Sequence, residues 1–248
     1  MSHRKVAIVT GALGGIGSIT CRELVKNDYL VIAVCRVRTD EEMAEWRDKY
    51  DLTTRDVKSF FMDVTDNQAC AVGLKTIFQE FGHVDVLINN VGITRDSQFK
   101  KMNFEQWNQV INTNLNSLFN MTQPIFQAMC EQGFGRIINI SSVNGLKGQF
   151  GQTNYSAAKA GMIGFTKALA YEGAGKGVTV NVVAPGYTRT PMVAAMKPEL
   201  LENITSQIPI KRLAEPSEVA AAIIYLASTE ASYITGETLS INGGQYMS

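Results

Sequence analysis

The sequence predicts an α/β domain in which helices cover both faces of a parallel β-sheet. Several short runs, such as residues 5–10 and 178–183, are continuously apolar and rich in β-branched residues, which is typical of strands buried on both faces. Longer stretches between them carry apolar residues at helical spacing. The 248 residues contain no Pro/Ser-rich linker, charge block or internal repeat, so we expect residues 1–248 to form a single domain.

Strands and helices are expected to alternate along the chain, which favours parallel pairing of the strands. The seven expected strands are residues 5–10, 29–34, 56–62, 84–88, 135–140, 178–183 and 238–241. Six helices are expected with them, among them residues 18–26, 67–81, 103–129, 155–175 and 216–227.

Composition excludes several classes of function. The 23 basic residues balance the 23 acidic ones, so no net basic field favours nucleic acid or an anionic membrane. No apolar stretch approaches the length of a membrane span and no signal-peptide pattern is seen, so the cytoplasm is the expected location. The four cysteines have no metal-ligand spacing and only two histidines accompany them, so we expect buried thiols and no metal site.

A glycine-rich turn follows the first expected strand and precedes the first expected helix. Glycines in this position let the backbone approach a pyrophosphate, which the helix N-terminus stabilises through its unpaired N–H groups. We therefore predict a dinucleotide here, although glycines also serve simple close packing. The expected contacts are Gly11, Leu13, Gly14, Gly15, Ile16 and Gly17.

Arg36 and Arg38 stand at the end of the second strand, which should face the adenosine ribose. An acidic residue there would select NAD, but two guanidinium groups offer charge-assisted hydrogen bonds to a 2′-phosphate. We therefore predict NADP (NADPH) as cofactor. The alternative is that one or both arginines only lie at a solvated helix start.

Polar and small residues also follow other strands, at what should be the same edge of the sheet. Because open parallel sheets bind ligands at the carboxyl ends of their strands, these residues predict one continuous crevice. They are Asp63 and Val64 beside the adenine, then Asn90, Val91, Gly92, Pro185, Gly186 and Thr188. Residues 187–213, rich in Met, Pro and small residues, suit a lid over this crevice.

Tyr155 and Lys159 are spaced to lie on one helix face, one turn apart. A neighbouring ammonium favours phenolate, so we expect Lys159 to lower the pKa of Tyr155. Ser142, at the end of the fifth strand, could hydrogen-bond the same substrate oxygen. The alternative is a half-exposed aromatic side chain and a solvated lysine. Asn114 is one of three amides within the helix 103–129, where it could distort the helix, hold water or be a satisfied core amide.

These motifs together resemble the short-chain dehydrogenase/reductase family along essentially the whole chain. The resemblance rests on Thr10-Gly-x-x-x-Gly15-Ile-Gly17, Asn89-Asn-x-Gly92, Asn114, Ser142, Tyr155-x-x-x-Lys159 and Pro185-Gly186. It implies a single-domain, Rossmann-type, doubly wound sheet, with a cofactor half at about 1–135 and a catalytic half at about 136–248. Val91 departs from the usual alanine, and we expect only slight repacking there.

The resemblance also implies roles for the catalytic residues. Tyr155 would be the general acid that protonates a carbonyl oxygen, and Ser142 would position that oxygen. Lys159 would hold the nicotinamide ribose and lower the pKa of the tyrosine. Asn114 would anchor a water that links the lysine to solvent. The hydride would come from the nicotinamide.

One branch of the family is more closely similar, the NADPH-dependent acetoacetyl-CoA reductases of polyhydroxyalkanoate synthesis. The stretches 90–96, 141–145, 147–155 and 185–187 carry this resemblance, which implies an (R)-3-hydroxybutyryl-CoA product. The family resemblance also implies a homotetramer built on helices 103–129 and 155–175 and on the C-terminal strand. The implied acyl-CoA contacts are Asp96, Lys101, Ser142, Gln149, Gln152, Tyr155 and Tyr187, although these polar residues could also line a loop without touching substrate.

Three alternatives remain open on the sequence alone. A 3-oxoacyl-acyl-carrier-protein reductase would share the reaction, but residues 131–134 lack the basic side chains that would attract an acidic carrier, which leaves Lys176 as a contributor. A non-catalytic, NADP-binding scaffold could use the same fold. A sugar or polyol dehydrogenase would keep the catalytic residues as well.

Overall fold

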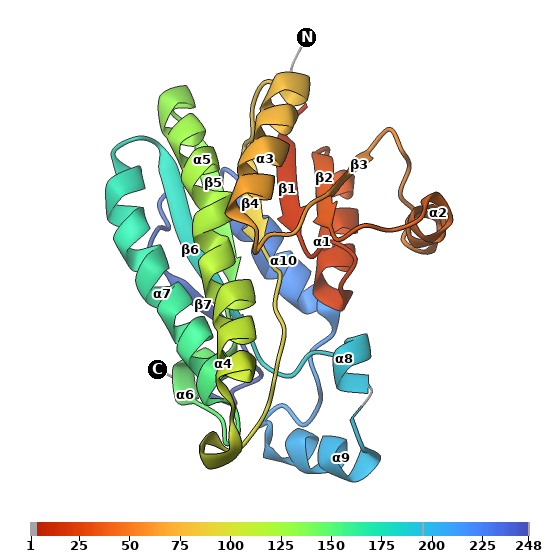
Figure 1. The fold of residues 1–248 in the computed structure, drawn as a ribbon, viewed down its shortest axis with the longest axis vertical. Coiled ribbons are helices and arrows are strands. Elements are labelled where there is room, and N and C mark those ends of the chain that lie inside the picture. The colour runs from red at the N-terminus through yellow and green to blue at the C-terminus, as the bar shows by residue number, and fades with distance from the viewer. Residues whose placement is uncertain (1–3, 195, 248) are drawn as a thin grey trace.

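A sheet of seven parallel strands lies at the centre of the computed structural model, which describes residues 4–194 and 196–247 (Figure 1). The strand order is β3-β2-β1-β4-β5-β6-β7, so the chain builds the sheet outwards in one direction from β1 and in the other from β4. The loops that follow β1 and β4 therefore lead to opposite faces of the sheet, and open parallel sheets bind ligands in the crevice between such loops. This confirms the predicted fold class. The strands are β1 (Val6–Thr10), β2 (Leu30–Cys35), β3 (Val57–Phe61), β4 (Val86–Asn89), β5 (Gly135–Ile140), β6 (Val178–Pro185) and β7 (Thr238–Ile241).

Each face of the sheet packs against its own set of helices, because side chains alternate between the faces along each strand. On β1, Val6 and Ile8 join the core under α3 (Asn67–Phe81), α5 (Ser117–Gln132) and α7 (Thr153–Ala174). Ala7 and Val9 join the opposite core under α1 (Gly15–Lys26), α2 (Asp40–Lys49) and α10 (Pro216–Ala227). Figure 1 shows α3, α5 and α7 side by side over one face.

The predicted helix 103–129 is interrupted. It consists of α4 (Phe104–Ile111), the π-helical turn η2 (Asn112–Asn116) and α5. A π-helical turn widens the helix by one residue, and such turns occur frequently at functional sites. The three amides of residues 112–116 therefore mark a real distortion, as one reading of the sequence predicted.

Residues 187–213 are more ordered than the sequence suggested. They contain α8 (Pro191–Ala194) and α9 (Pro198–Gln207), and in Figure 1 both lie together below the main body of the molecule. Val193, Ile208 and Leu213 form a small hydrophobic cluster of their own in this segment. Apolar spacing over so short a stretch does not distinguish a lid with its own core from an irregular loop.

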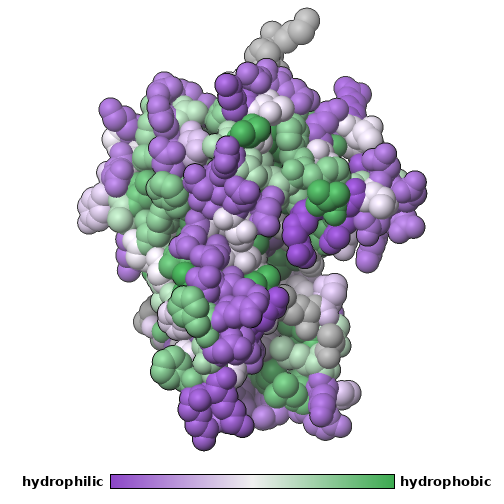
Figure 2. All heavy atoms as spheres, viewed as in Figure 1, coloured by the Kyte–Doolittle hydropathy of each residue, from purple (hydrophilic) through white to green (hydrophobic). Residues whose placement is uncertain are grey.

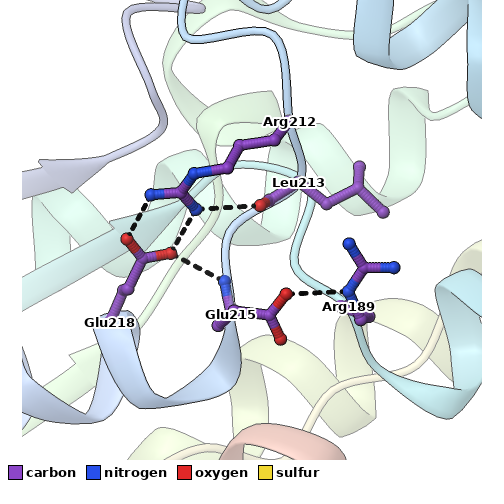
Figure 3. Close-up of polar contacts among 5 residues, drawn as sticks. All are labelled: Arg189, Arg212, Leu213, Glu215 and Glu218. Atoms are coloured by element: carbon purple, nitrogen blue, oxygen red, sulfur yellow. Dashed lines mark hydrogen bonds and ion pairs between the residues drawn. The ribbon is translucent and has the colours of Figure 1, made fainter.

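The two ends of this segment are fastened close together at the first turn of α10 (Figure 3). Arg212 donates two hydrogen bonds to the Glu218 carboxylate, at 2.6 and 2.7 Å, which lower the pKa of Glu218 to about 2. Arg189 donates to Glu215 at 2.8 Å. Ala214 bridges both ends, since its N–H donates to the Tyr187 carbonyl and its carbonyl accepts from Arg189 N–H. The segment is thus a closed loop with a fixed base.

Hydrophilic residues cover most of the face in Figure 2, with apolar patches among them. No helix in the described ranges is long and apolar enough to cross a membrane.

Candidate active site

The glycine-rich turn forms a tight cradle between β1 and α1. Gly11 has a φ of 61°, in the left-handed region that favours glycine, and its carbonyl accepts from Gly14 N–H at 3.0 Å. A Cβ at Gly17 would collide with that same carbonyl and lie 2.9 Å from Asn90 Nδ2. The N-terminus of α1 opens directly above this turn, so its first N–H groups are available to a pyrophosphate. The residues present therefore fit a dinucleotide.

Asn90 joins the ends of β1 and β4. Its Nδ2 donates to the carbonyls of Thr10 and Gly11 at 3.2 and 3.1 Å. The Thr10 hydroxyl accepts in return from the N–H groups of Asn90 and Val91. Asn90 therefore ties the glycine-rich turn after β1 to the end of β4. Thr10, which is absent from the predicted site residues, completes this link.

The predicted adenosine contacts follow two neighbouring strands. Arg36 and Arg38 are exposed just after β2, and neither forms an ion pair within the described part of the chain. Asp63 follows β3, where its Oδ1 accepts from Thr65 N–H at 2.9 Å. Because Cys35 of β2 pairs in register with Phe61 of β3, these groups share one edge of the sheet.

Val64 lies beside Asp63 and is 7% exposed. Its carbonyl accepts from the Asn120 side chain at 2.9 Å. Asn120, a buried residue of α5 that the sequence analysis did not identify, therefore fixes the loop after β3.

At the end of β6, Pro185 is followed by a glycine that the packing requires. A Cβ at Gly186 would lie 2.9 Å from the Cα of Asn242. Thr188 is 4% exposed and donates to the Gly186 carbonyl at 3.1 Å. These contacts fix the loop at the carboxyl end of β6, and the roles of Pro185, Gly186 and Thr188 as cofactor contacts stay predictions.

Tyr155 and Lys159 lie on one face of α7, as their spacing predicted. Lys159 is 3% exposed and donates to the Ile140 carbonyl at 2.6 Å, with its Nζ 5.7 Å from the centre of the Tyr155 ring. A Cβ at Gly92 would be 3.4 Å from the same Nζ. The ammonium is therefore enclosed between β4, β5 and α7 and is not a solvated surface lysine.

Burial dominates the electrostatics of this pair. It raises the pKa of Tyr155 to about 12, while a hydrogen bond with Ser142 lowers that pKa and the charges of Asp96 and Tyr187 raise it. Burial also lowers the pKa of Lys159 to about 8. The expectation that Lys159 brings the pKa of Tyr155 below its ordinary value is therefore wrong for the protein alone, because burial raises this pKa and the Lys159 ammonium is not among the groups that lower it. Tyr155 keeps its proton at neutral pH.

Asn114 anchors the loop after β4. It is fully buried in η2, its Oδ1 accepts from Ile93 N–H at 2.8 Å, and its Nδ2 donates to the Ile93 carbonyl at 2.9 Å. The loop that leads from Gly92 to Asp96 is thereby fixed against the distorted helix. The role of Asn114 in holding a water stays a prediction.

The predicted substrate contacts separate into two groups. Gln152 Nε2 donates to Asp96 at 2.8 Å, and Tyr187 lies close enough to Tyr155 for their charges to interact. Lys101 and Gln149 are exposed, and no hydrogen bond in the described ranges ties either side chain to the catalytic groups. Their role as substrate contacts stays a prediction.

Asn144, which is absent from the predicted site residues, connects the first group to Ser142. Its Nδ2 donates to Gln152 Oε1 at 2.9 Å, and its backbone N–H donates to Ser142 Oγ at 3.1 Å. Ser142 caps the short helix α6 (Val143–Lys147), so this contact also fixes the Ser142 side chain. An amide two residues after a predicted site serine was the only available sequence signal.

The described residues contain no group of three or more His, Cys, Asp or Glu side chains that could hold a metal ion.

Comparison with known proteins agrees with this geometry. The family model described as short chain dehydrogenase matches residues 5–200. An acetoacetyl-CoA reductase from Acinetobacter sp. strain RA3849 is 57% identical over 247 residues, which cover 100% of both chains. An acetoacetyl-CoA reductase from Allochromatium vinosum is 49% identical, covering 98% of this chain and 99% of that protein. A 3-oxoacyl-acyl-carrier-protein reductase from Vibrio harveyi is 45% identical, covering 98% of each chain. The chain is therefore an oxidoreductase that belongs to the short-chain dehydrogenase family.

Proposed function

We propose that this enzyme uses NADPH to reduce acetoacetyl-CoA, or a similarly short 3-oxoacyl-CoA, to the (R)-3-hydroxyacyl-CoA. The observation that carries the proposal is the hydrogen-bonded pair Asp96–Gln152, from the loop after β4 and the start of α7, beside a half-buried Tyr155 and a buried Lys159 on that same helix. A small dicarbonyl thioester needs such hydrogen-bonding groups next to the proton donor. Relatives that carry the name acetoacetyl-CoA reductase support this choice of substrate.

The catalytic residues each have a simple task in this reaction. The nicotinamide, when bound, supplies the hydride to the ketone carbon. Tyr155 donates its phenolic proton to the carbonyl oxygen, so that the C=O group becomes an alcohol. Ser142 hydrogen-bonds the same oxygen, since its Oγ accepts from Asn144 N–H and keeps its own proton to donate. The Lys159 ammonium stabilises the phenolate that forms on Tyr155, because the ammonium is buried 5.7 Å from the centre of the Tyr155 ring and water screens it little.

NADP is proposed over NAD because of the arginines after β2. Both side chains are exposed and no acidic residue stands in their place at positions 35–38. Guanidinium groups favour a 2′-phosphate through charge-assisted hydrogen bonds. The remaining cofactor contacts proposed are those of the glycine cradle, the loops after β3 and β4, and the β6 end.

The principal alternative substrate is a 3-oxoacyl group on acyl carrier protein, since one relative bears that name. Residues Glu131–Gly133 at the end of α5 are exposed and carry an acidic but no basic side chain. These three residues offer an acidic carrier protein no electrostatic attraction, which leaves Lys176 as the basic side chain of the groove that Glu131 lines. A non-catalytic NADP-binding scaffold is disfavoured by the intact Ser142, Tyr155 and Lys159.

The test follows NADPH oxidation with acetoacetyl-CoA and with acetoacetyl-acyl-carrier-protein on the same purified protein. We expect a strong preference for the CoA ester. Preference for the carrier protein would instead assign the enzyme to fatty acid synthesis. Tyr155→Phe should lower kcat by about 10²- to 10⁴-fold and leave NADPH affinity within a few-fold. Loss of NADPH binding in this variant would make Tyr155 a structural residue.

We further propose a cytoplasmic homotetramer that serves polyhydroxybutyrate synthesis. The outer faces of α5 and α7 carry a groove of about 610 Å³, lined by Phe119, Phe126, Phe165 and Leu169 among others. Phe119 is 59% exposed, which supports packing of these helices against another subunit. Met162, also on α7, is 1% exposed and belongs to the subunit core. Light scattering should give about four times the 27.2 kDa of one chain. A monomeric mass would refute the tetramer.

We also infer that residues 187–213 act as a lid over the crevice. Their fixed base at α10 and their separate hydrophobic cluster support movement as a unit.

A further inference from the structure

The helix α2 is attached to the rest of the molecule at few points. Of its ten residues only Met43 and Trp46 are buried, and both join the core that lies under α1 and α10. Figure 1 shows α2 at the edge of the molecule. Within residues 4–194 and 196–247, the one hydrogen bond that ties α2 to another helix or strand is donated by Trp46. The position of α2 therefore depends strongly on this side chain.

The hydrogen bond of Trp46 continues into the glycine-rich turn. Trp46 Nε1 donates to Ser18 Oγ at 2.9 Å, and Ser18 Oγ donates to the Ala12 carbonyl at 3.2 Å. Ser18 is fully buried in the first turn of α1, and an indole N–H can only donate, so the direction of both hydrogen bonds is fixed. Two successive hydrogen bonds thus join α2 to the turn that fits a pyrophosphate.

The arginines that follow β2 are tied to the same helix. Arg36 and Arg38 lie within residues 36–39, which connect the end of β2 to the start of α2. Thr39 caps α2, since its hydroxyl accepts from Glu42 N–H at 3.2 Å while its own N–H donates to the Glu42 carboxylate. A connection this short follows any displacement of the helix. The place of both guanidinium groups therefore depends on where α2 packs.

NADPH carries its two phosphate sites on one adenosine ribose. The pyrophosphate leaves from the 5′ position and the additional phosphate from the 2′ position, so the separation between them is nearly fixed. Arginine binds phosphate through charge-assisted hydrogen bonds of specific geometry, so a small displacement of the guanidinium groups weakens them. NADH has no 2′-phosphate, and its binding does not depend on where Arg36 and Arg38 lie.

We propose that Trp46 is a positioning residue for the 2′-phosphate of NADPH. Its hydrogen bond to Ser18 holds α2, and with it Arg36 and Arg38, at the distance from the glycine-rich turn that the adenosine ribose requires. This inference rests on the proposed binding of NADPH by the two arginines. It adds a buried residue, outside the cofactor contacts, that sets the preference for NADPH over NADH.

The first experiment measures the binding of NADPH and of NADH by calorimetry, with no substrate present. Trp46→Phe keeps an aromatic ring in the core and removes the N–H group. It should raise the Kd for NADPH by roughly three- to tenfold, the range for one neutral hydrogen bond, and leave the Kd for NADH within about twofold. An equal rise for both cofactors would make Trp46 a core residue only, and an unchanged Kd for NADPH would equally overturn the proposal.

The second experiment asks whether Trp46 acts through the arginines. In a background that carries Arg36→Gln and Arg38→Gln, Trp46→Phe should change the Kd for NADPH by less than about twofold, because the groups that it positions are gone. The same loss as in the wild-type background would overturn the proposal.

Ser18→Ala removes the same hydrogen bond from the other side and serves if Trp46→Phe folds poorly. It should raise the Kd for NADPH relative to that for NADH by about threefold or more. An unchanged ratio of the two constants would overturn the proposal.

A matched control and the arginine variant separate this inference from the proposed function. Trp107→Phe makes the same change in α4, which packs against α7, and should leave both Kd values within about twofold. If the Arg36→Gln, Arg38→Gln variant binds NADPH as tightly as wild type, the proposed choice of NADP and this inference fail together. If that variant loses NADPH affinity while Trp46→Phe keeps the wild-type preference, the inference alone fails.

Discussion

Replacing Lys159 by methionine should change how the stability of the protein depends on pH. The lysine is 3% exposed and its hydrogen-bond partner is the neutral carbonyl of Ile140. Methionine is unbranched and of similar length, so it should fill the same space without a charge. The variant should lose catalysis and retain the fold.

The size of the effect follows from the burial of the ammonium. Burial lowers the pKa of Lys159 from 10.5 to about 8, which corresponds to roughly 3 kcal/mol against the charged form. Between these two values the unfolded chain binds a proton that the folded protein does not, so stability rises with pH. The wild-type protein regains this stability above about pH 10.5 and has lost it below about pH 8.

The measurement is urea unfolding of wild type and Lys159→Met at fixed protein concentration, from about pH 7 to about pH 9.5. Over this window the free energy of unfolding of wild type should increase relative to the variant by roughly 2 kcal/mol. Loss of the hydrogen bond to Ile140 shifts the difference by a constant and does not alter its slope.

Lys167→Met provides the matched control, because Lys167 is an exposed lysine of the same helix, solvated by water in the folded and unfolded chain. Its difference from wild type should stay constant across the same window. A constant difference for Lys159→Met as well would refute the reasoning, since it would mean that water reaches the ammonium and offsets its burial.

Three further predictions address the cofactor and the loop after β4. Replacing Arg36 and Arg38 together by glutamine should raise the KM for NADPH at least about tenfold and leave that for NADH within about twofold, since only NADPH offers a 2′-phosphate; equal effects would remove the case for NADP. Gly17→Ala should weaken NADPH binding, measured by calorimetry, by roughly tenfold or more, because the added Cβ collides with the glycine-rich turn. The control is Gly164→Ala, where the added Cβ points into open space on α7; it should leave NADPH binding unchanged and stabilise the helix by about 0.5–1 kcal/mol. Asn114→Leu leaves two backbone groups of the loop unpaired and should lower the free energy of unfolding by about 2–4 kcal/mol in urea; a loss below about 1 kcal/mol would contradict its role as an anchor.

The order and type of the elements were determined by local sequence patterns. Strand positions were predicted to within about two residues because apolar runs bounded by glycine and polar residues carry a local signal. The glycine-rich turn and the Tyr155–Lys159 spacing were equally local, since a turn or a helix face is defined within a few residues. Even the π-helical turn had a local signal, in three amides inside an apolar helix.

Only the tertiary structure decided how the chemical groups act on one another. Asn144 meets Gln152 because α6 and the start of α7 converge, and no spacing in the sequence encodes that contact. The sign of the pKa shift of Tyr155 likewise depended on burial, which spacing to Lys159 does not reveal. Periodicity and turn chemistry are properties of neighbours along the chain, whereas hydrogen-bond direction and desolvation depend on every group that packing brings nearby.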